Sequence, residues 1–246
     1  MGCALLRLHL ELPGGRLDIY YRQCCGAGRC RDGSYTNERG AGMSREQLSQ
    51  AIIDAGRFLY SRGWSPATSS NYSARLSATE VLLTVSGKHK GQLGIDDVLA
   101  TDLDGNSLEP GKKPSAETLL HTQLYSCKPQ VGAVLHTHSV NATVLSRLTE
   151  ADHLVFEDYE LQKAFSGVVT HESRVVVPIF DNDQDIARLA AKVQPWLDAH
   201  PDCAGYLIRG HGLYTWGAKM SDALRQIEAF EFLFECELKT LAILNR

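Results

Sequence analysis

Long apolar runs are missing from this sequence of 246 residues. No stretch approaches the roughly 18 consecutive apolar residues of a membrane-spanning helix, so the sequence predicts no membrane segment. A strong charge of either sign is missing as well, because 25 lysines and arginines nearly balance 29 acidic residues, for a net charge of -4. That balance argues against nucleic acid or an anionic membrane as the main partner.

A signal peptide and a disulfide framework are also missing. The apolar start, MGCALLRLHLELPGG, is short and is interrupted by charged and polar residues, unlike a secretory signal. Seven cysteines are an odd number, and their spacing matches no disulfide pattern. Both features favour the cytoplasm and reduced thiols. A metal site at the close trio Cys24, Cys25 and Cys30 lacks the second cysteine pair that would complete it.

Residues 1–42 differ from the rest of the chain. They hold 8 of the 21 glycines and six arginines but no lysine, and they show no sustained period of 3.6 or 2. From Met43 the pattern becomes regular, because Ser44 and Gln47 form a capping box that is followed by an apolar stripe at helical spacing. We therefore predict a disordered tail or a non-native leader over residues 1–42 and one folded domain over residues 43–246.

Helix-like and strand-like segments alternate within that domain. A hairpin is expected at 71–76 and 81–85, and a strand that ends or forms a sheet edge at Pro178 follows later. Helices are expected at 44–62, 115–127, 157–165, from 183 onward, and from 221 to about 245. The alternation predicts a layered α/β domain.

Two histidines two residues apart follow a short apolar run at 132–135 that is typical of a buried strand. Side chains at i and i+2 of a strand leave the same face, so His136 and His138 should point together. The pair alone fits either a metal site or a packed core in which both ring nitrogens have partners. His211 lies between two glycines in a predicted turn, and three neutral imidazoles with an open position are typical of a catalytic zinc site.

Candidate carboxylates lie in two predicted helices. Glu117 lies in the first turn of a helix capped by Ser115, where a glutamate also complements the helix dipole. Glu157, Asp158 and Glu160 share an acidic stretch, and the residue pattern does not choose among them. The apolar neighbours of Glu160 predict a partly desolvated carboxylate with a raised pKa.

Small hydroxyl residues and glycine crowd three predicted loops near two lysines. A phosphate-binding loop of the GxxxxGK[ST] type is missing, yet hydroxyls, turns and a helix N-terminus together suit a phosphate monoester. The candidate phosphate-binding residues are Thr68, Asn71, Ser86, Gly87 and Ser115.

Five stretches occur in the order and spacing of a known family. TSSNYSARL, LLTVSGKHKG, PSAETLLHTQLY, AVLHTHSVNAT and YLIRGHGLYTWG make the chain from Met43 onward resemble the class II aldolase/adducin head family. The resemblance implies a three-layer α/β/α domain with a mostly antiparallel central sheet, usually assembled as a homotetramer with sites near subunit interfaces. It also implies one Zn²⁺ per subunit, held by His136, His138 and His211, and a phosphate site at the five residues named above.

Within the family, YELQKAF and RGHGLYTWG resemble a dehydratase branch. The resemblance implies that the substrate is a small sugar phosphate, 5-methylthioribulose 1-phosphate. Its dehydration gives 2,3-diketo-5-methylthiopentyl 1-phosphate in methionine salvage. The branch implies Glu160 as the catalytic acid/base, whereas the aldolases keep theirs at the position of Glu117. Animal dehydratases carry cysteine at the position of Glu117, so both Glu160 and Glu117 are candidates for the catalytic acid/base.

Two other functions are compatible with this fold. A class II aldolase or 4-epimerase acting on another sugar phosphate would share the zinc and the phosphate site. A non-catalytic adducin-like assembly domain would keep the fold and lose the histidine ligands, and all three histidines are retained here.

Overall fold

The computed structural model describes residues 5–12, 15–22 and 43–244, and the chain divides into two compact units, Met1–Gly42 and Met43–Arg246. In the first unit, β1 (Leu5–Leu12) pairs antiparallel with β2 (Gly15–Arg22). The interpretation that residues 1–42 lack a sustained period is wrong for β1. Leucine alternates with polar residues over 6–12, which is the period of a strand. Cys24, Cys25 and Cys30, whose spacing does not complete a metal site, lie outside the described residues.

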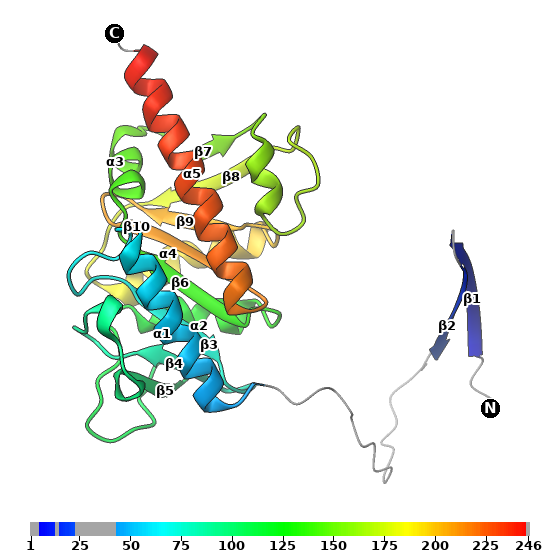
Figure 1. Ribbon diagram of the computed structural model, residues 1–246, viewed down its shortest axis with the longest axis horizontal. Helices are drawn as coiled ribbons and strands as arrows, with labels where there is room; N and C mark the ends of the chain where they lie inside the picture. Colours follow the sequence, from blue (N-terminus) through cyan, green and yellow to red (C-terminus); the bar gives the residue numbers. More distant parts are fainter. Residues whose placement is uncertain (1–4, 13–14, 23–42, 245–246) are drawn as a thin grey trace. The chain divides into compact units, whose positions relative to one another are not determined.

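The second unit is built on one eight-stranded sheet with the order β5-β4-β3-β6-β10-β9-β8-β7 (Figure 1). Every neighbouring pair is antiparallel except β8 and β9, which are parallel. The prediction of a mostly antiparallel sheet is confirmed. The strands are β3 (Asn71–Arg75), β4 (Glu80–Thr84), β5 (Val98–Asp102), β6 (Ala133–Thr137), β7 (His153–Phe156), β8 (Val175–Phe180), β9 (Gly205–Ile208) and β10 (Gly212–Gly217).

Helices cover both faces of this sheet and complete the three layers. One face carries α1 (Arg45–Ser61), α3 (Val140–Leu148) and α5 (Met220–Leu244), and the other carries α2 (Thr118–Cys127) and α4 (Ile186–Ala199). Figure 1 shows α1 and α5 crossing in front of the strands. Three short 3-10 helices lie in the connections: η1 (Lys90–Gln92), η2 (Ile95–Asp97) and η3 (Glu160–Ala164).

Strand alternation divides the core into two parts. In β6, Ala133 and Leu135 pack on the α1, α3 and α5 side, whereas Val134 packs with Leu120 of α2 on the opposite side. Side chains at i and i+2 share a face, so His136 leaves the sheet on the α2 and α4 side. The central strand therefore aims this histidine at the N-terminus of α2.

Several local predictions can be compared with the structure. The capping box is confirmed, since Ser44 Oγ accepts from the Gln47 amide at 3.3 Å and Gln47 Oε1 accepts from the Ser44 amide at 2.8 Å. The hairpin of β3 and β4 is also confirmed. The expected edge or end at Pro178 is wrong, because this residue pairs with His153 of β7 and the strand continues to Phe180. The helix expected at 157–165 is the short η3, and β7 precedes it unpredicted.

Two predictions from composition concern thiols and membranes. Cys127, Cys203 and Cys236 are free cysteines, in line with the expected reduced thiols. Among the helices of the described ranges, none combines the length and apolar character needed to cross a membrane.

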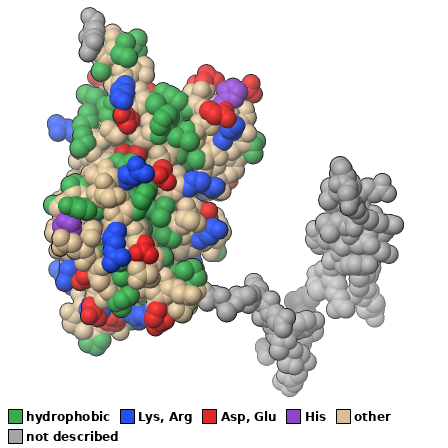
Figure 2. All heavy atoms as spheres, in the orientation of Figure 1, with side chains coloured by type: hydrophobic (Ala, Val, Ile, Leu, Met, Phe, Trp, Pro, Cys, Tyr) green, Lys and Arg blue, Asp and Glu red, His purple; other side chains and the backbone are tan. Residues whose placement is uncertain are grey.

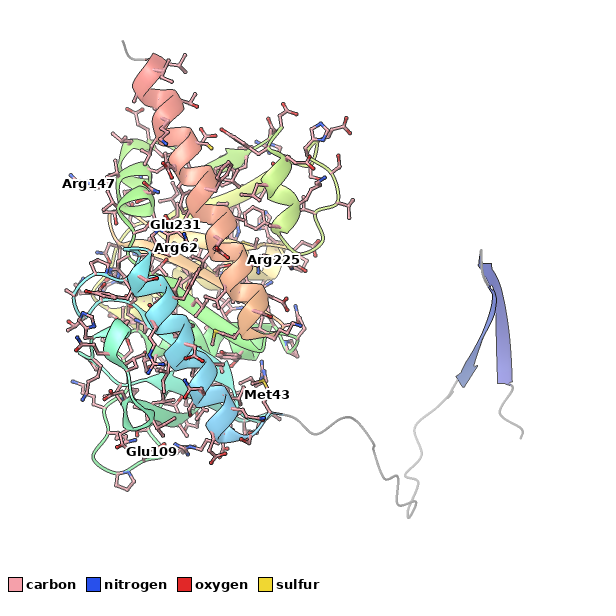
Figure 3. All side chains as sticks on the ribbon, viewed as in Figure 1. Met43, Arg62, Glu109, Arg147, Arg225 and Glu231 are labelled. Atoms are coloured by element: carbon pink, nitrogen blue, oxygen red, sulfur yellow. The ribbon has the colours of Figure 1, made fainter. Side chains whose placement is uncertain are left out.

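Glu231 is a buried acid on α5, near the start of α3 (Figure 3). Only 2% of the residue is exposed. Its Oε2 accepts from Asn141 Nδ2 at 3.4 Å, and its Oε1 has no hydrogen-bond partner among the described residues. Burial raises the pKa of Glu231 to about 7. Below about pH 7 the folded protein therefore favours the protonated carboxyl.

We expect Glu231→Gln to stabilise the protein more at pH 8 than at pH 5. A carboxyl whose pKa is raised on folding makes stability fall as pH rises between the unfolded and folded values, from 4.5 to about 7. The glutamine variant escapes this loss, which amounts to roughly 3 kcal/mol at 1.36 kcal/mol per pH unit. Urea unfolding at both pH values measures the difference. Glu228→Gln, on an exposed position of α5, is the control, and an equal gain at both pH values would contradict the prediction.

Candidate active site

The pairing of β6 with β10 gathers three histidines that lie far apart in the sequence. His136 lies in β6, His138 follows its end, and His211 lies in the turn before β10. Because Tyr214 pairs with His136, the turn comes to lie beside His138. The ring centroids are 4.5 Å apart for His136 and His138, 4.5 Å for His138 and His211, and 5.0 Å for His136 and His211.

Two glycines make this close approach possible. Gly210 has a φ of +65°, which is a left-handed conformation that favours glycine. A Cβ atom at Gly212 would lie 1.9 Å from the carbonyl oxygen of Thr137. Any side chain at 212 would therefore push β10 away from β6 and separate His211 from the other two histidines.

Hydrogen bonds fix the orientation of two of the rings. His136 Nδ1 donates to the carbonyl of Leu213 at 2.9 Å, and the ring stacks on Tyr214 at a centroid distance of 4.0 Å. His211 Nδ1 lies 3.3 Å from Asn182 Oδ1. The Nε2 atoms of His136 and His211 then face each other at 3.3 Å. Partners on the outer nitrogens that leave the inner ones free are typical of metal-binding histidines.

Glu117 approaches the histidines from the N-terminus of α2. Its Oε1 lies 3.1 Å from His211 Nε2, and its Oε2 lies 3.3 Å from His136 Nε2. The structure begins α2 at Thr118, so Glu117 precedes the helix, and Ser115 Oγ accepts from the Glu117 amide at 3.3 Å. Ligand atoms of Glu117 and the three histidines all lie within 4.8 Å of one another.

The cluster has the charge and the unfilled bonds of a metal site. Burial, followed by the neighbouring histidines, lowers the pKa of His136 well below its usual value and that of His138 to about 2, so both rings are neutral. His138 Nε2 is buried and has no hydrogen-bond partner within the described part of the chain. Neutral imidazoles beside a carboxylate, with one orphaned nitrogen, fit a divalent metal ion.

A cavity of about 270 Å³ opens beside the cluster. Glu117, His138 and His211 form one part of its wall. The candidate phosphate-binding residues line the same cavity: Thr68, Asn71, Ser86, Gly87 and Ser115. The structure thus brings together three loops that the sequence places up to 47 residues apart, at one end of the metal cluster.

Comparison with known proteins decides the family. The family model described as Class II Aldolase and Adducin N-terminal domain matches residues 50–238. The chain belongs to this class II aldolase family.

Curated members of the family are similar over nearly their whole length. Methylthioribulose-1-phosphate dehydratase of Pseudomonas syringae pv. syringae (strain B728a) is 92% identical over 204 residues, which cover 83% of this chain and 100% of that protein. The protein of the same name from Pseudomonas aeruginosa (strain UCBPP-PA14) is 82% identical over 200 residues, covering 81% of this chain and 98% of that protein.

Solved structures show the same class II aldolase fold at lower identity. YgbL from Klebsiella pneumoniae superimposes with a TM-score of 0.69 at 24% identity, covering 80% of this chain and 91% of that one. L-fuculose-1-phosphate aldolase from Thermus thermophilus gives a TM-score of 0.62 at 25% identity, covering 80% and 95%. These neighbours confirm the α/β class predicted from the sequence.

A buried lysine lines this class II aldolase site, and the sequence alone did not distinguish it from its exposed neighbour. Lys90 is 1% exposed and lines the cavity, and its Nζ donates to the carbonyls of Thr68 at 3.2 Å and Lys88 at 2.6 Å. Burial lowers the pKa of Lys90 to about 8. Lys88, its neighbour in the motif, instead pairs with Asp97 at 2.9 Å. The stretch LLTVSGKHKG contains both lysines, and only the fold shows that Lys90 is buried and Lys88 is exposed.

Within a single subunit, Glu160 lies outside this class II aldolase site. It is in η3, its side chain is 72% exposed, and it is not among the residues lining the cavity. A hydrogen bond and ion pair with Lys163 lower the pKa of its carboxyl. The expectation of a partly desolvated carboxylate with a raised pKa is wrong for the single chain. Apolar neighbours in the sequence do not bury a side chain that the short helix turns outward.

Proposed function

We propose that this protein is a methylthioribulose-1-phosphate dehydratase, a hydro-lyase that takes water from 5-methylthioribulose 1-phosphate. The observation that carries the proposal is 92% identity over the full length of the Pseudomonas syringae protein of that name. The product is 2,3-diketo-5-methylthiopentyl 1-phosphate, which places the enzyme in methionine salvage. The free thiols of the described residues suit a cytoplasmic enzyme.

We propose that His136, His138 and His211 hold one Zn²⁺ per subunit. Neutral imidazoles in a set of three, with room for substrate oxygen, are the usual ligands of catalytic zinc. A zinc ion held there supplies Lewis acidity that polarises the substrate ketone and stabilises negative charge on its oxygen. Glu117 lies beside the Nε2 atoms of His136 and His211. Its carboxylate would therefore be close to the carbons next to a ketone bound at this site.

Glu117 can then act as the base for the dehydration. The C3 proton passes to its carboxylate, and the C3–H electron pair forms the C2–C3 double bond of an enediol while the C2 carbonyl pair moves to oxygen. Return of that pair forms a C3–C4 double bond and expels the C4 hydroxyl, which leaves with a proton as water. The resulting C3 enol then takes a proton at C4 and loses its hydroxyl proton to give the diketone. The hydroxyl and amide groups of the three loops, with buried Lys90, bind the phosphate and hold C3 near the carboxylate. One end of the cavity would thus bind the phosphate, and the other end, at Glu117 and the histidines, would carry out the proton transfer.

We also propose a homotetramer, in which Glu160 serves a neighbouring subunit. Three apolar side chains of α3 are exposed at spacing i, i+4 and i+8: Val140 by 71%, Val144 by 39% and Leu148 by 58%. Hydrophobic side chains lie on the surface over α3 in Figure 2. This stripe begins two residues after His138, so a subunit packed on it would lie beside the site. An exposed Glu160 can reach substrate only across such a contact.

Glu160→Gln is expected to lower kcat by about a hundredfold, the usual scale for losing an acid/base group. Glu157→Gln, in the same acidic stretch and paired with Arg174, is the matched control and should stay near wild type. Mixed tetramers of Glu160→Gln and His138→Ala subunits should regain part of the activity, because some sites then receive both intact groups. Full activity in Glu160→Gln would remove this glutamate from the mechanism.

The reaction itself is tested with purified protein and 5-methylthioribulose 1-phosphate, by following the absorbance of the diketone. Retro-aldol cleavage of a sugar phosphate without diketone formation would favour the aldolase alternative. A folded protein that neither dehydrates nor cleaves sugar phosphates would favour the non-catalytic assembly domain.

We propose that residues 43–246 form the catalytic domain and that 1–42 are dispensable. The family match lies within 50–238, and the 204 residues shared with the Pseudomonas syringae relative equal the length of Met43–Arg246. A chain beginning at Met43 should keep its Tm and kcat/KM. A clear drop in either value after truncation would mean that the first 42 residues support the domain.

A further inference from the structure

A chain of buried polar side chains runs from the site into the core between the sheet and α2. Asn71 Nδ2 donates to Glu117 Oε2 at 2.7 Å, and Asn71 Oδ1 is hydrogen-bonded to His121 Nε2. His121 Nδ1 lies 2.7 Å from Ser73 Oγ, which lies 2.9 Å from the hydroxyl of Tyr125. Apart from Glu117 at the cavity wall, each of these residues is at most 5% exposed.

The chemistry of the groups gives every bond in this chain one direction. A carboxylate only accepts, so Asn71 must turn its amide N–H toward Glu117 and its oxygen toward His121. That oxygen also only accepts, so His121 must carry its proton on Nε2. The bare Nδ1 then accepts from the hydroxyl of Ser73, which in turn accepts from Tyr125. Each donor therefore points along the chain toward Glu117.

His121 is the member of the chain that prevents reversal. If its ring were replaced by an apolar group, the buried Asn71 Oδ1 would lose its donor, and the amide would no longer be held from both ends with its N–H toward Glu117. Burial lowers the pKa of His121 to about 3, so the ring stays neutral and keeps a single N–H. The His121 ring also meets Tyr214 edge-on at a centroid distance of 5.5 Å, and Tyr214 stacks on His136. The His121 ring thus contacts both Asn71, which holds the Glu117 carboxylate, and Tyr214, which stacks on His136.

We infer that His121 is a positioning residue, which acts through Asn71 to hold the Glu117 carboxylate toward the three histidines. The inference rests on the proposed function only where it gives Glu117 a proton to move. It also changes the role of Asn71, which the sequence assigned to phosphate. The Asn71 amide bonds to Glu117 and His121 and has one N–H left for substrate.

Steady-state kinetics of two His121 variants test the inference. Loss of a group that orients a reacting side chain costs about 10- to 100-fold. His121→Leu should therefore lower kcat by that factor, with KM and zinc content unchanged. His121→Gln can donate to Asn71 and accept from Ser73, so it should recover most of kcat. His200→Leu, which changes an exposed histidine, is the matched control. Equal losses in the Leu and Gln variants, or a change in KM alone, would overturn the inference.

A second measurement does not depend on turnover. In protein with ¹⁵N-labelled histidine and no metal, the resonances that disappear in His121→Gln should show a proton on Nε2 and a bare Nδ1. A proton on Nδ1 instead would reverse the chain and overturn the inference, even if His121→Leu fails to fold. Wild-type protein that shows the expected tautomer but makes no diketone would count against the proposed reaction, not against the positioning role.

Discussion

Glu117→Gln should lower kcat by about a hundredfold or more, the scale expected for removing a general base. Glutamine has nearly the same size and can still accept from Asn71, which donates to Oε2 at 2.7 Å in the wild type. It cannot take a proton from C3. Zinc content should stay near wild type, because the three imidazoles remain. The loss should therefore lie in kcat rather than in KM.

Elemental analysis and steady-state kinetics of the same preparation check this result. Glu150→Gln, at an exposed position, is the matched control. If Glu117→Gln remains active while Glu160→Gln is inactive, then proton transfer belongs to Glu160. If both variants lose activity, the two carboxylates share the proton steps, one from each side of a subunit contact.

Removing any one of the three histidines should abolish most of the metal binding and lower kcat/KM by at least about a hundredfold, since the metal supplies several kcal/mol of charge stabilisation. His211→Ala is the most direct of the three tests, because this ring lies in a turn and replacing it disturbs the core least. His136 is fully buried and stacked on Tyr214, so its loss should also lower the Tm. Undiminished zinc in any variant would exclude that residue as a ligand.

The sequence was informative where local chemistry demands particular residues. Two histidines at i and i+2 of a buried strand share a face, and the third precedes Gly212, which β10 needs in order to approach β6 closely. The capping box and the β3–β4 hairpin are equally local, and both were predicted.

Features that depend on distant parts of the chain were missed. His121 occupies an ordinary helical position, and only the packing of α2 on β3 brings it to Asn71. The exposure of Glu160 depends on how η3 turns, which its apolar neighbours do not determine. The strand containing Pro178 continues because β7 returns to pair with it. Burial and pairing partners are set by the assembled sheet, and a single sequence carries little direct record of them.

The β6–β10 pairing has a consequence for how the enzyme is made. His138 and His211 belong to segments separated by more than 70 residues, and the long-range pairing of β6 with β10 brings them together. A growing polypeptide on the ribosome therefore has no site until β10 has emerged and docked. Metal capture is then a late event that follows completed folding, and bound metal shifts the folding equilibrium toward the native state by mass action. If the metal is scarce in the cell, newly made chains should therefore be more exposed to proteolysis than mature chains that hold it.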